Sequence, residues 1–377
     1  MVKRILIILL IVIFLTLGSL TVSAKEEDAI DEYENLLDNI PSDIADLLPD
    51  GLFSDNNDDI INAVNAMTSW EYILNTVFDI LGINVKSMIS IFAIIISLLV
   101  LCSLLNMLKN SMKNESLSRI LDFCGSAIVV ASLVELSKEP FSRCYILFDQ
   151  LRLFVNSLSP FICAMYAMGG NVATAIVNNY GLIVFLTIFE NVCIISLEIV
   201  IGICMSLTVA SAFLKDGNLS QLTNSIKKTY TFFIGFLMLV FTTVISAQSL
   251  IATKADTLTS KTAKMLATQM IPLVGGTVGE SLKAAGASIE YLRSNFGVAI
   301  IIILLLMILP SFISIVMYRI TFMISNAIAG LLGCKREGEI LTDVSSIYGY
   351  VIAIISIASI TVLFLITLFA KCSSPLT

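Results

Sequence analysis

Long apolar runs that are almost free of charge constrain this chain more than any other feature of its sequence. A helix needs about 20 apolar residues to cross a bilayer. Four runs meet that length: Met88–Leu108, Tyr230–Ile251, Phe296–Tyr318 and Ile347–Ala370. Since 57% of the chain is hydrophobic and only 14% is charged, the sequence predicts an all-α fold, a polytopic integral membrane helical bundle.

Two further runs carry ionisable residues. Gly181–Leu214 is long enough to span a bilayer but contains Glu190 and Glu198, whereas Ile120–Leu136 is barely long enough and contains Asp122. We expect both to be spans, because ionisable groups inside a membrane helix usually face a protein interior or an aqueous path. The prediction is therefore about six spans.

The segment Leu153–Met168 is harder to assign. It is short and is interrupted by Asn156 and Pro160, so it is either a short span or a re-entrant segment packed among other helices. We favour re-entry, because a full crossing would move the later basic loops to the outside and break the positive-inside rule. With re-entry, the basic residues of three loops all lie in the cytoplasm: Lys109, Lys113 and Arg119, then Lys215, Lys227 and Lys228, then Arg319, Lys335 and Arg336.

The N-terminus has the layout of a secretory signal peptide over residues 1–24. Lys3 and Arg4 precede an apolar run, and small residues end it at Ala24, as is typical of a cleavage site. An uncleaved membrane anchor is the alternative. In either case the residues after Ala24 are expected on the non-cytoplasmic side.

Residues 25–85 form an acidic segment, with 15 of the 29 acidic residues of the chain and one of the 22 basic ones. This composition is consistent with export, because cytoplasmic loops are enriched in Lys and Arg. Apolar pairs such as Leu36 with Leu37 and Leu47 with Leu48, broken by Pro41, Pro49 and Gly51, predict short helices. We expect a small helical cap that leans on the membrane helices of residues 86–251.

Residues 252–295 are predicted to form an amphipathic helical hairpin. Apolar residues recur at steps of three and four from Val278 to Phe296, on one helical face. Between the two halves, Pro272 and the pair Gly275 and Gly276 form a break suited to a chain reversal. Gly279 completes a G-x-x-x-G spacing with Gly275, which allows close helix approach in membranes. Residues 296–377 hold the last membrane helices.

Several reaction classes are excluded by residues that the chain lacks. It contains no His, which removes Ser-His-Asp hydrolysis and imidazole metal sites. Its eight Cys show no C-x-x-C spacing and are most simply small buried residues. No P-loop or dinucleotide-binding fingerprint is present, so we predict a protein that is not an enzyme and has no cofactor, metal or nucleic-acid partner.

Two stretches of the chain resemble the stage III sporulation protein AE family of endospore-forming bacteria. One runs from Leu219 to Gly297 and includes MIPLVGGTVGES; the other is SLSPFICAMYAMGGNVATAIVNNYG, from Ser157 to Gly181. The resemblance covers roughly residues 70–370, and the signal peptide, exported segment and spans match the layout of that family.

The resemblance implies a role in the membrane of the mother cell that surrounds the forespore. Members of the family are subunits of a secretion-like channel complex that joins the two cells. The implied partners are a cytoplasmic secretion-type ATPase, other products of the same stage III operon, ring-forming proteins between the two membranes, and membrane lipid. Homo-oligomers are left open. The family has no established catalytic residues to carry over.

Physical reasoning supplies the candidate site residues. Glu190 and Glu198 lie about 80° apart around a helix, and Asn191 lies nearly on the face of Glu198. Our hypothesis is that this polar stripe, with Asp122, lines a conduit or carries protons. The alternatives are a structural contact between helices, or a position of Glu198 at a membrane edge.

Pro310 lies inside the run Phe296–Tyr318, where it removes a backbone hydrogen bond and predicts a kink. We expect this kink to fit the helix into its bundle rather than to gate it. A second function class stays open at this stage, a self-contained proton-coupled secondary transporter. Such transporters often carry inverted repeats with paired broken helices, and this sequence shows no convincing internal repeat.

Overall fold

The structure is a computed structural model of the whole chain. It describes residues 40, 42–45, 47–53, 57–111, 115–168, 171–213, 219–270 and 275–371. The predicted signal peptide and Pro272 lie outside these residues. Within the described ranges every regular element is a helix, which confirms the predicted all-α class.

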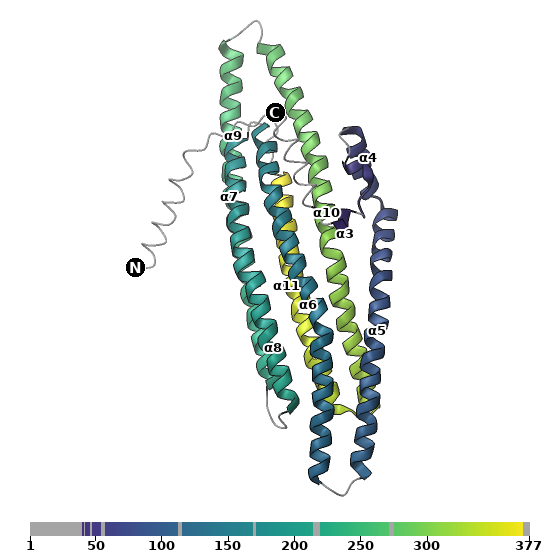
Figure 1. The fold of residues 1–377 in the computed structure, drawn as a ribbon. Helices are drawn as coiled ribbons and strands as arrows, with labels where there is room; N and C mark the ends of the chain where they lie inside the picture. The colour runs from purple at the N-terminus through teal and green to yellow at the C-terminus, as the bar shows by residue number, and fades with distance from the viewer. Residues whose placement is uncertain are drawn as a thin grey trace, which may run out of the picture.

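Long helices that alternate in direction make up the bundle (Figure 1). They are α5 (Trp70–Ser111), α6 (Glu115–Met168), α7 (Val172–Ile188), the π-helix η2 (Phe189–Ile194), α8 (Ile195–Phe213), α9 (Leu219–Met270), α10 (Gly275–Leu331) and α11 (Lys335–Lys371). The longest, α10, has 57 residues and would extend over roughly 85 Å at 1.5 Å per residue. Since the hydrocarbon core is only about 30 Å thick, much of each rod lies outside it.

Six helical stretches are long and apolar enough to cross a membrane: Glu71–Lys109, Ser116–Ala164, Val192–Phe213, Leu219–Leu258, Ala299–Leu331 and Lys335–Thr367. The prediction of about six spans is confirmed. α5, α8 and α10 end and α6, α9 and α11 begin at one end of the bundle, whereas α6 and α9 end and α7 and α10 begin at the other (Figure 1). Of the basic residues that were assigned to one side of the membrane, Lys109, Arg119, Lys335 and Arg336 lie close to the first of these two ends.

The re-entrant interpretation of Leu153–Met168 is wrong. That segment and Ile120–Leu136 belong to the same continuous helix, α6, which runs through both Pro140 and Pro160. Pro160 does not break the helix, because the loss of one backbone hydrogen bond is small beside the packing of the apolar face on either side of it. The single rod preserves the alternation of direction, so the basic loops still share one end.

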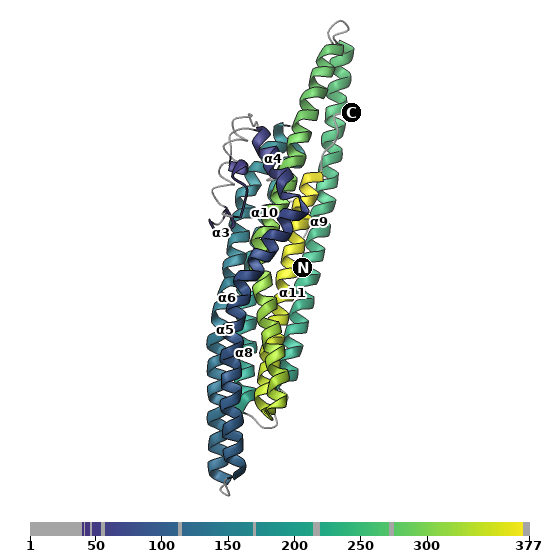
Figure 2. The ribbon, with the colours of Figure 1, turned by 90° about the vertical axis from the view of Figure 1, so that its right-hand side faces the viewer.

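The predicted hairpin consists of the ends of two membrane helices. α9 continues past Leu258 to Met270, and α10 begins at Gly275 and continues into the next span. The two ends project together beyond the rest of the bundle (Figure 2). The hairpin therefore does not lie over the bundle as a separate cover. Gly275, Gly276 and Gly279 lie in the first two turns of α10.

The small helices before Trp70 form part of the expected cap. They are α3 (Ser42–Ala45), the 3-10 helix η1 (Asp50–Phe53) and α4 (Asn57–Met67). Leu52 and Met67 are fully buried, α3 and α4 contact α10, and the Tyr72 hydroxyl donates a hydrogen bond to the carbonyl of Leu47. The first membrane helix begins at Trp70, well before residue 86, because Ser69 caps it by accepting a hydrogen bond from the Tyr72 N–H.

The turn between α10 and α11 shows how tightly these rods are joined. Gly333 has a φ of 74°, and the N–H of Cys334 donates to the carbonyl of Ala329 at 2.9 Å, the pattern of a Schellman cap that favours glycine. The Cys334 thiol is buried and donates to the Leu99 carbonyl of α5 at 3.6 Å. Burial raises the pKa of this thiol, which keeps it a neutral donor.

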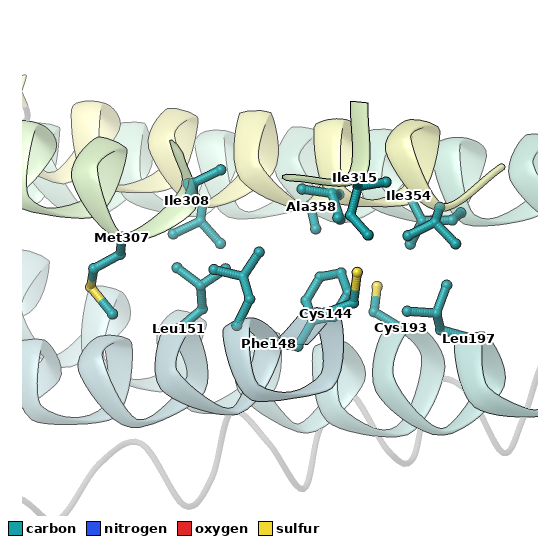
Figure 3. Close-up of a cluster of buried hydrophobic side chains, with 14 of the residues drawn as sticks. Cys144, Phe148, Leu151, Cys193, Leu197, Met307, Ile308, Ile315, Ile354 and Ala358 are labelled. Atoms are coloured by element: carbon teal, nitrogen blue, oxygen red, sulfur yellow. The ribbon is translucent and has the colours of Figure 1, made fainter. Parts of the chain in front are cut away.

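The core lies where α6 and α8 face α10 and α11. Figure 3 shows Phe148 and Leu151 of α6 opposite Ile308 and Ile315 of α10, together with Ile354 of α11. All five side chains are buried. α10 continues as one helix through Pro310, at the height of this cluster. The predicted burial of cysteines is confirmed for Cys102, Cys144, Cys193, Cys204 and Cys334, whereas Cys124 is exposed.

Candidate functional site: a charged face of α6

One side of α6 carries a row of exposed charged residues in its middle third. They form three ion pairs within the helix: Lys138 with Glu135 at 2.5 Å, Arg143 with Glu139 at 2.7 Å, and Arg152 with Asp149 at 2.7 Å. Their side chains are between 34% and 71% exposed. Ser142 and Asn156 lie on the same side and are also exposed. We call these residues, from Glu135 to Asn156, the charged face.

The opposite side of the same turns is deeply buried. Phe141, Leu147, Phe148 and Leu151 have at most 7% of their surface exposed, and the ring of Phe141 stacks on Tyr348 of α11 at 4.9 Å between centroids. This part of α6 is therefore amphipathic. Its apolar side fixes the helix in the core, and that packing holds the charged face outward.

The charged face lies at the same height as the apolar outer surface of α9. Phe141 of α6 packs on Tyr348 of α11, and Tyr230 of α9 packs on Tyr350, two residues further along α11. From that level, Phe232, Phe236 and Leu239 project outward from α9 and are 75%, 58% and 64% exposed. α6 and α9 lie on opposite sides of the bundle (Figure 2). At one height, then, the α9 side is apolar, whereas the α6 side carries six charged side chains beside exposed Ile146 and Leu153.

Exposing the charged face to lipid would cost a large free energy. A charged side chain at the centre of a membrane helix costs about 2.5 to 3.5 kcal/mol on insertion scales, and the charged face carries six. Ion pairing within the helix offsets part of this cost, but exposed pairs contribute only about 0 to 1 kcal/mol each in water. The charged face must therefore contact water or another polar protein surface.

Glu198 lies at the border of this face. It is exposed on the first turn of α8 and is close enough to Tyr145 of α6 for an electrostatic interaction. Glu190 and Asn191 fall within the π-helix η2, and their side chains lie outside those that the structure describes. π-Helices within longer helices occur frequently at functional sites, so these two residues mark an irregular segment of the span that the sequence singled out.

The structure does not bring Asp122 together with Glu198. Both carboxylate oxygens of Asp122 accept hydrogen bonds from the Lys109 ammonium at 2.7 Å, which ties α6 to α5 near their connecting turn. Tyr145, the neighbour of Glu198, is 23 residues further along α6, or roughly 34 Å at 1.5 Å per residue. Asp122 therefore serves a local structural contact.

Sequence reasoning missed Asp256 of α9, which is only 7% exposed. Its two carboxylate oxygens accept hydrogen bonds from the backbone N–H groups of Ala173 at 3.0 Å and Thr174 at 2.7 Å. These donors belong to the first turn of α7 and normally bond to a capping side chain of their own helix. Asp256 caps that helix from outside, and the positive end of the helix dipole favours its charge.

A second missed cluster joins α9 to α11. Lys227 is 5% exposed and donates a hydrogen bond to the hydroxyl of Ser346. Ser346 in turn donates to the Asp343 carbonyl at 2.8 Å, and the Asp343 carboxylate accepts from Ser220 at 2.6 Å. The sequence predicts Lys227 in a cytoplasmic loop, but this residue lies inside the bundle, where a charged residue is normally paired.

Taken together, these features define a class: a polytopic helical membrane protein with an apolar belt on one side, a charged face on the other, and no group of three Cys, Asp or Glu suited to a metal among its described residues. The sequence model of the family described as Stage III sporulation protein AE matches residues 55–373, and the chain belongs to that family.

A curated relative supports the assignment. The chain is 22% identical over 349 residues to the stage III sporulation protein AE of Bacillus subtilis (strain 168), an alignment that covers 91% of this chain and 85% of that protein. No solved structure matches the chain.

Proposed function

We propose that this chain is a non-enzymatic membrane subunit of the channel complex that joins mother cell and forespore during endospore formation. Family membership supports the sporulation role. The charged face of α6 is the observation that favours a channel over a simple anchor, since it holds six charged residues at the height of an apolar belt. An anchor needs no such face, whereas an aqueous path does.

The orientation follows from the positive-inside rule. The end of the bundle with Lys109, Arg119, Lys335 and Arg336 is cytoplasmic, in the mother cell. The opposite end, with the projecting hairpin of α9 and α10, faces the space between the two membranes. We propose that a cytoplasmic secretion-type ATPase binds at the first end and that ring-forming proteins of the complex bind at the second.

A genetic experiment tests the proposal. The chain is deleted in its host and restored as wild type, as a Glu139→Leu, Arg143→Leu double variant, or as Phe236→Leu. The double variant removes one ion pair as a unit and leaves no unpaired charge. We expect the deletion to block heat-resistant spores and late forespore gene expression without slowing vegetative growth, the double variant to restore neither, and Phe236→Leu to restore both.

Membrane levels of each variant are measured by immunoblot. Normal sporulation in the deletion strain would contradict the proposed function and would leave a self-contained transporter as the better account.

A Glu190→Gln, Glu198→Gln variant in the same strain tests the stripe inferred from the sequence. We expect it to lose spore yield at normal membrane levels, and full yield would remove these two residues from the path.

A further inference from the structure

The outer side of α11 carries a strip of residues that changes character along the helix. α11 contacts both α9 and α10 and lies with them on the side of the bundle opposite α6 (Figure 2). Residues that recur at steps of three and four share one side of a helix, and on this side they are at least partly exposed: Thr342, Ser346, Gly349, Ala353, Ile357, Ile360 and Phe364. We call these seven residues the α11 strip. It is small and polar as far as Gly349 and apolar beyond it.

The guanidinium of Arg319, on α10, covers the middle of this strip. A Cβ added to Gly349 would lie 3.1 Å from Arg319 Cζ and 3.3 Å from both of its Nη atoms, so the guanidinium lies against the bare backbone of Gly349. The buried Nε of Arg319 has no hydrogen-bond partner. Among the residues that the structure describes, no carboxylate forms an ion pair with Arg319.

This arginine therefore needs an anion. Arg319 belongs to the candidate span Ala299–Leu331, and charged residues within membrane spans normally pair with a partner. Its neighbour across the strip, Lys227, donates to the Ser346 hydroxyl and has Asp343 close enough for an electrostatic interaction. Asp343 thus balances Lys227, and the charge of Arg319 stays unbalanced.

The depth of Arg319 corresponds to the edge of the apolar belt. Lys227 bonds to Ser346, which is three residues before Gly349 on α11. At that level α9 changes from charged to apolar: Lys228 is exposed, and Phe232, one turn further, is 75% exposed. A lipid phosphate lies at such a border between polar and apolar surface.

The apolar part of the strip has the length of one lipid leaflet. Ala353 and Phe364 are 11 residues apart, or about 16 Å at 1.5 Å per residue, and half of a hydrocarbon core is about 15 Å. Ile360 and Phe364 are 66% and 46% exposed. The α11 strip thus offers a cation at one end and an acyl-chain length of apolar surface beyond it.

We propose that the α11 strip binds one anionic phospholipid, with its phosphate on Arg319 and an acyl chain along Ala353 to Phe364. The planar fork of a guanidinium matches phosphate oxygens in a bidentate arrangement, and basic sites between membrane helices bind lipid headgroups. A carboxylate of a protein partner would balance Arg319 but would leave the apolar part of the strip uncovered. A phospholipid satisfies both parts, and it requires no other protein of the sporulation complex.

Native mass spectrometry of the full-length chain in detergent tests the site. Phosphatidylglycerol is titrated against the wild type, and diacylglycerol with the same acyl chains serves as the ligand without phosphate. Arg319→Gln removes the cation, and Gly349→Ala retains every charge but places a Cβ where the guanidinium lies. The matched control, Arg119→Gln, removes an exposed arginine of α6. Thermal unfolding shows whether each variant is folded.

We expect the wild type to bind one phosphatidylglycerol at least about tenfold more tightly than diacylglycerol, because charge-assisted hydrogen bonds hold the phosphate. Arg319→Gln should weaken that binding about tenfold, and Arg119→Gln should change it less than about twofold, since exposed charges are screened. The affinity of Gly349→Ala should fall between those two. Phosphatidylglycerol with a photoactivatable group in its acyl chain should cross-link to residues 353–364 in the wild type and less in Arg319→Gln.

Three results would overturn the inference. Equal phosphatidylglycerol affinity in Arg319→Gln and the wild type would mean that another anion, such as a partner's carboxylate, meets this arginine. Displacement of the lipid by millimolar inorganic phosphate would mean a site for free anions. Cross-links spread evenly over α5, α9 and α11 would mean an unspecific lipid shell. Each result leaves the sporulation phenotype of the deletion strain as a separate test of the proposed function.

Discussion

Individual polar residues hold the rods of this bundle in register. Asp256 joins α9 to the start of α7, Lys109 joins α5 to α6, and Lys227 joins α9 to α11. None of these contacts is visible in a hydropathy pattern, because each joins residues on two different helices. The sequence singled out Asp122 and grouped it with the polar stripe of Glu190 and Glu198, because a sequence alone does not show that Lys109 lies beside Asp122.

Replacement of Asp256 tests the cap on α7. Asp256→Ala leaves two buried N–H groups without acceptors, and we expect a loss of about 2 to 4 kcal/mol in the free energy of unfolding in detergent micelles. Asp256→Asn retains a neutral acceptor and should lose about half as much. Asp149→Ala removes an exposed carboxylate and should cost under about 1 kcal/mol. Equal losses for Asp256→Ala and Asp149→Ala would contradict the cap.

Gly338 permits the close approach of α11 to α10. A Cβ at this position would lie 2.7 Å from the Asn326 side-chain oxygen, so in Gly338→Ala that side chain must turn aside, which should cancel most of the helix gain and leave the free energy of unfolding within about 0.5 kcal/mol of the wild type. In an Asn326→Ala background the same change should stabilise it by about 0.5 to 1 kcal/mol, since alanine favours a helix. Thermal unfolding of the four proteins gives the sign of each change, and destabilisation in both backgrounds would refute the contact.

At the scale of elements, α6 shows where sequence reasoning succeeds and where it fails. Its two apolar ends were recognised as separate segments, and no structure was predicted for the residues between them. Over residues 137–152 the buried side chains recur at helical spacing while the charged ones occupy the opposite side. A search for uniformly apolar spans passes over such an amphipathic stretch, and Asn156 and Pro160 favoured an interruption.

The pairing of α5 with α6 is testable by charge exchange. Lys109 and Asp122 are 33% and 23% exposed and 2.7 Å apart. Lys109→Asp or Asp122→Lys alone places like charges together and should lower the midpoint of thermal unfolding. The double exchange should recover most of the loss, because it restores an opposite-charge pair. Additive losses in the double variant would mean that the two residues do not interact.

For the whole molecule, two features could be predicted from the sequence. The length of the apolar runs gives the number of spans, and the positions of the basic residues, with helices that alternate in direction, give the end at which the basic loops lie. The charged face could not, because its significance lies in its height relative to α9, which only packing reveals. The hairpin was predicted as a pair of helices. Its projection beyond the bundle could not be predicted, because it depends on how far α9 and α10 extend past the ends of the other helices.

Topology follows from this arrangement. α5 begins and α11 ends at the end of the bundle opposite the basic loops (Figure 1). Alkaline phosphatase fused after Lys371 should therefore be active outside the cytoplasm, and a fusion in the connection 332–334 should be inactive. The reverse pattern would invert the proposed orientation, and activity at both sites would contradict the span count.

The central claim is that charged and apolar surfaces of this bundle lie at one height in the membrane. Spin labels on Ser142→Cys and Phe232→Cys, in native membranes of sporulating cells, test it through collisions with a water-soluble nickel complex and with oxygen, which concentrates in lipid. We predict that the label on α6 collides mainly with nickel and the label on α9 mainly with oxygen. Nickel at both positions, or oxygen at both, would contradict the account.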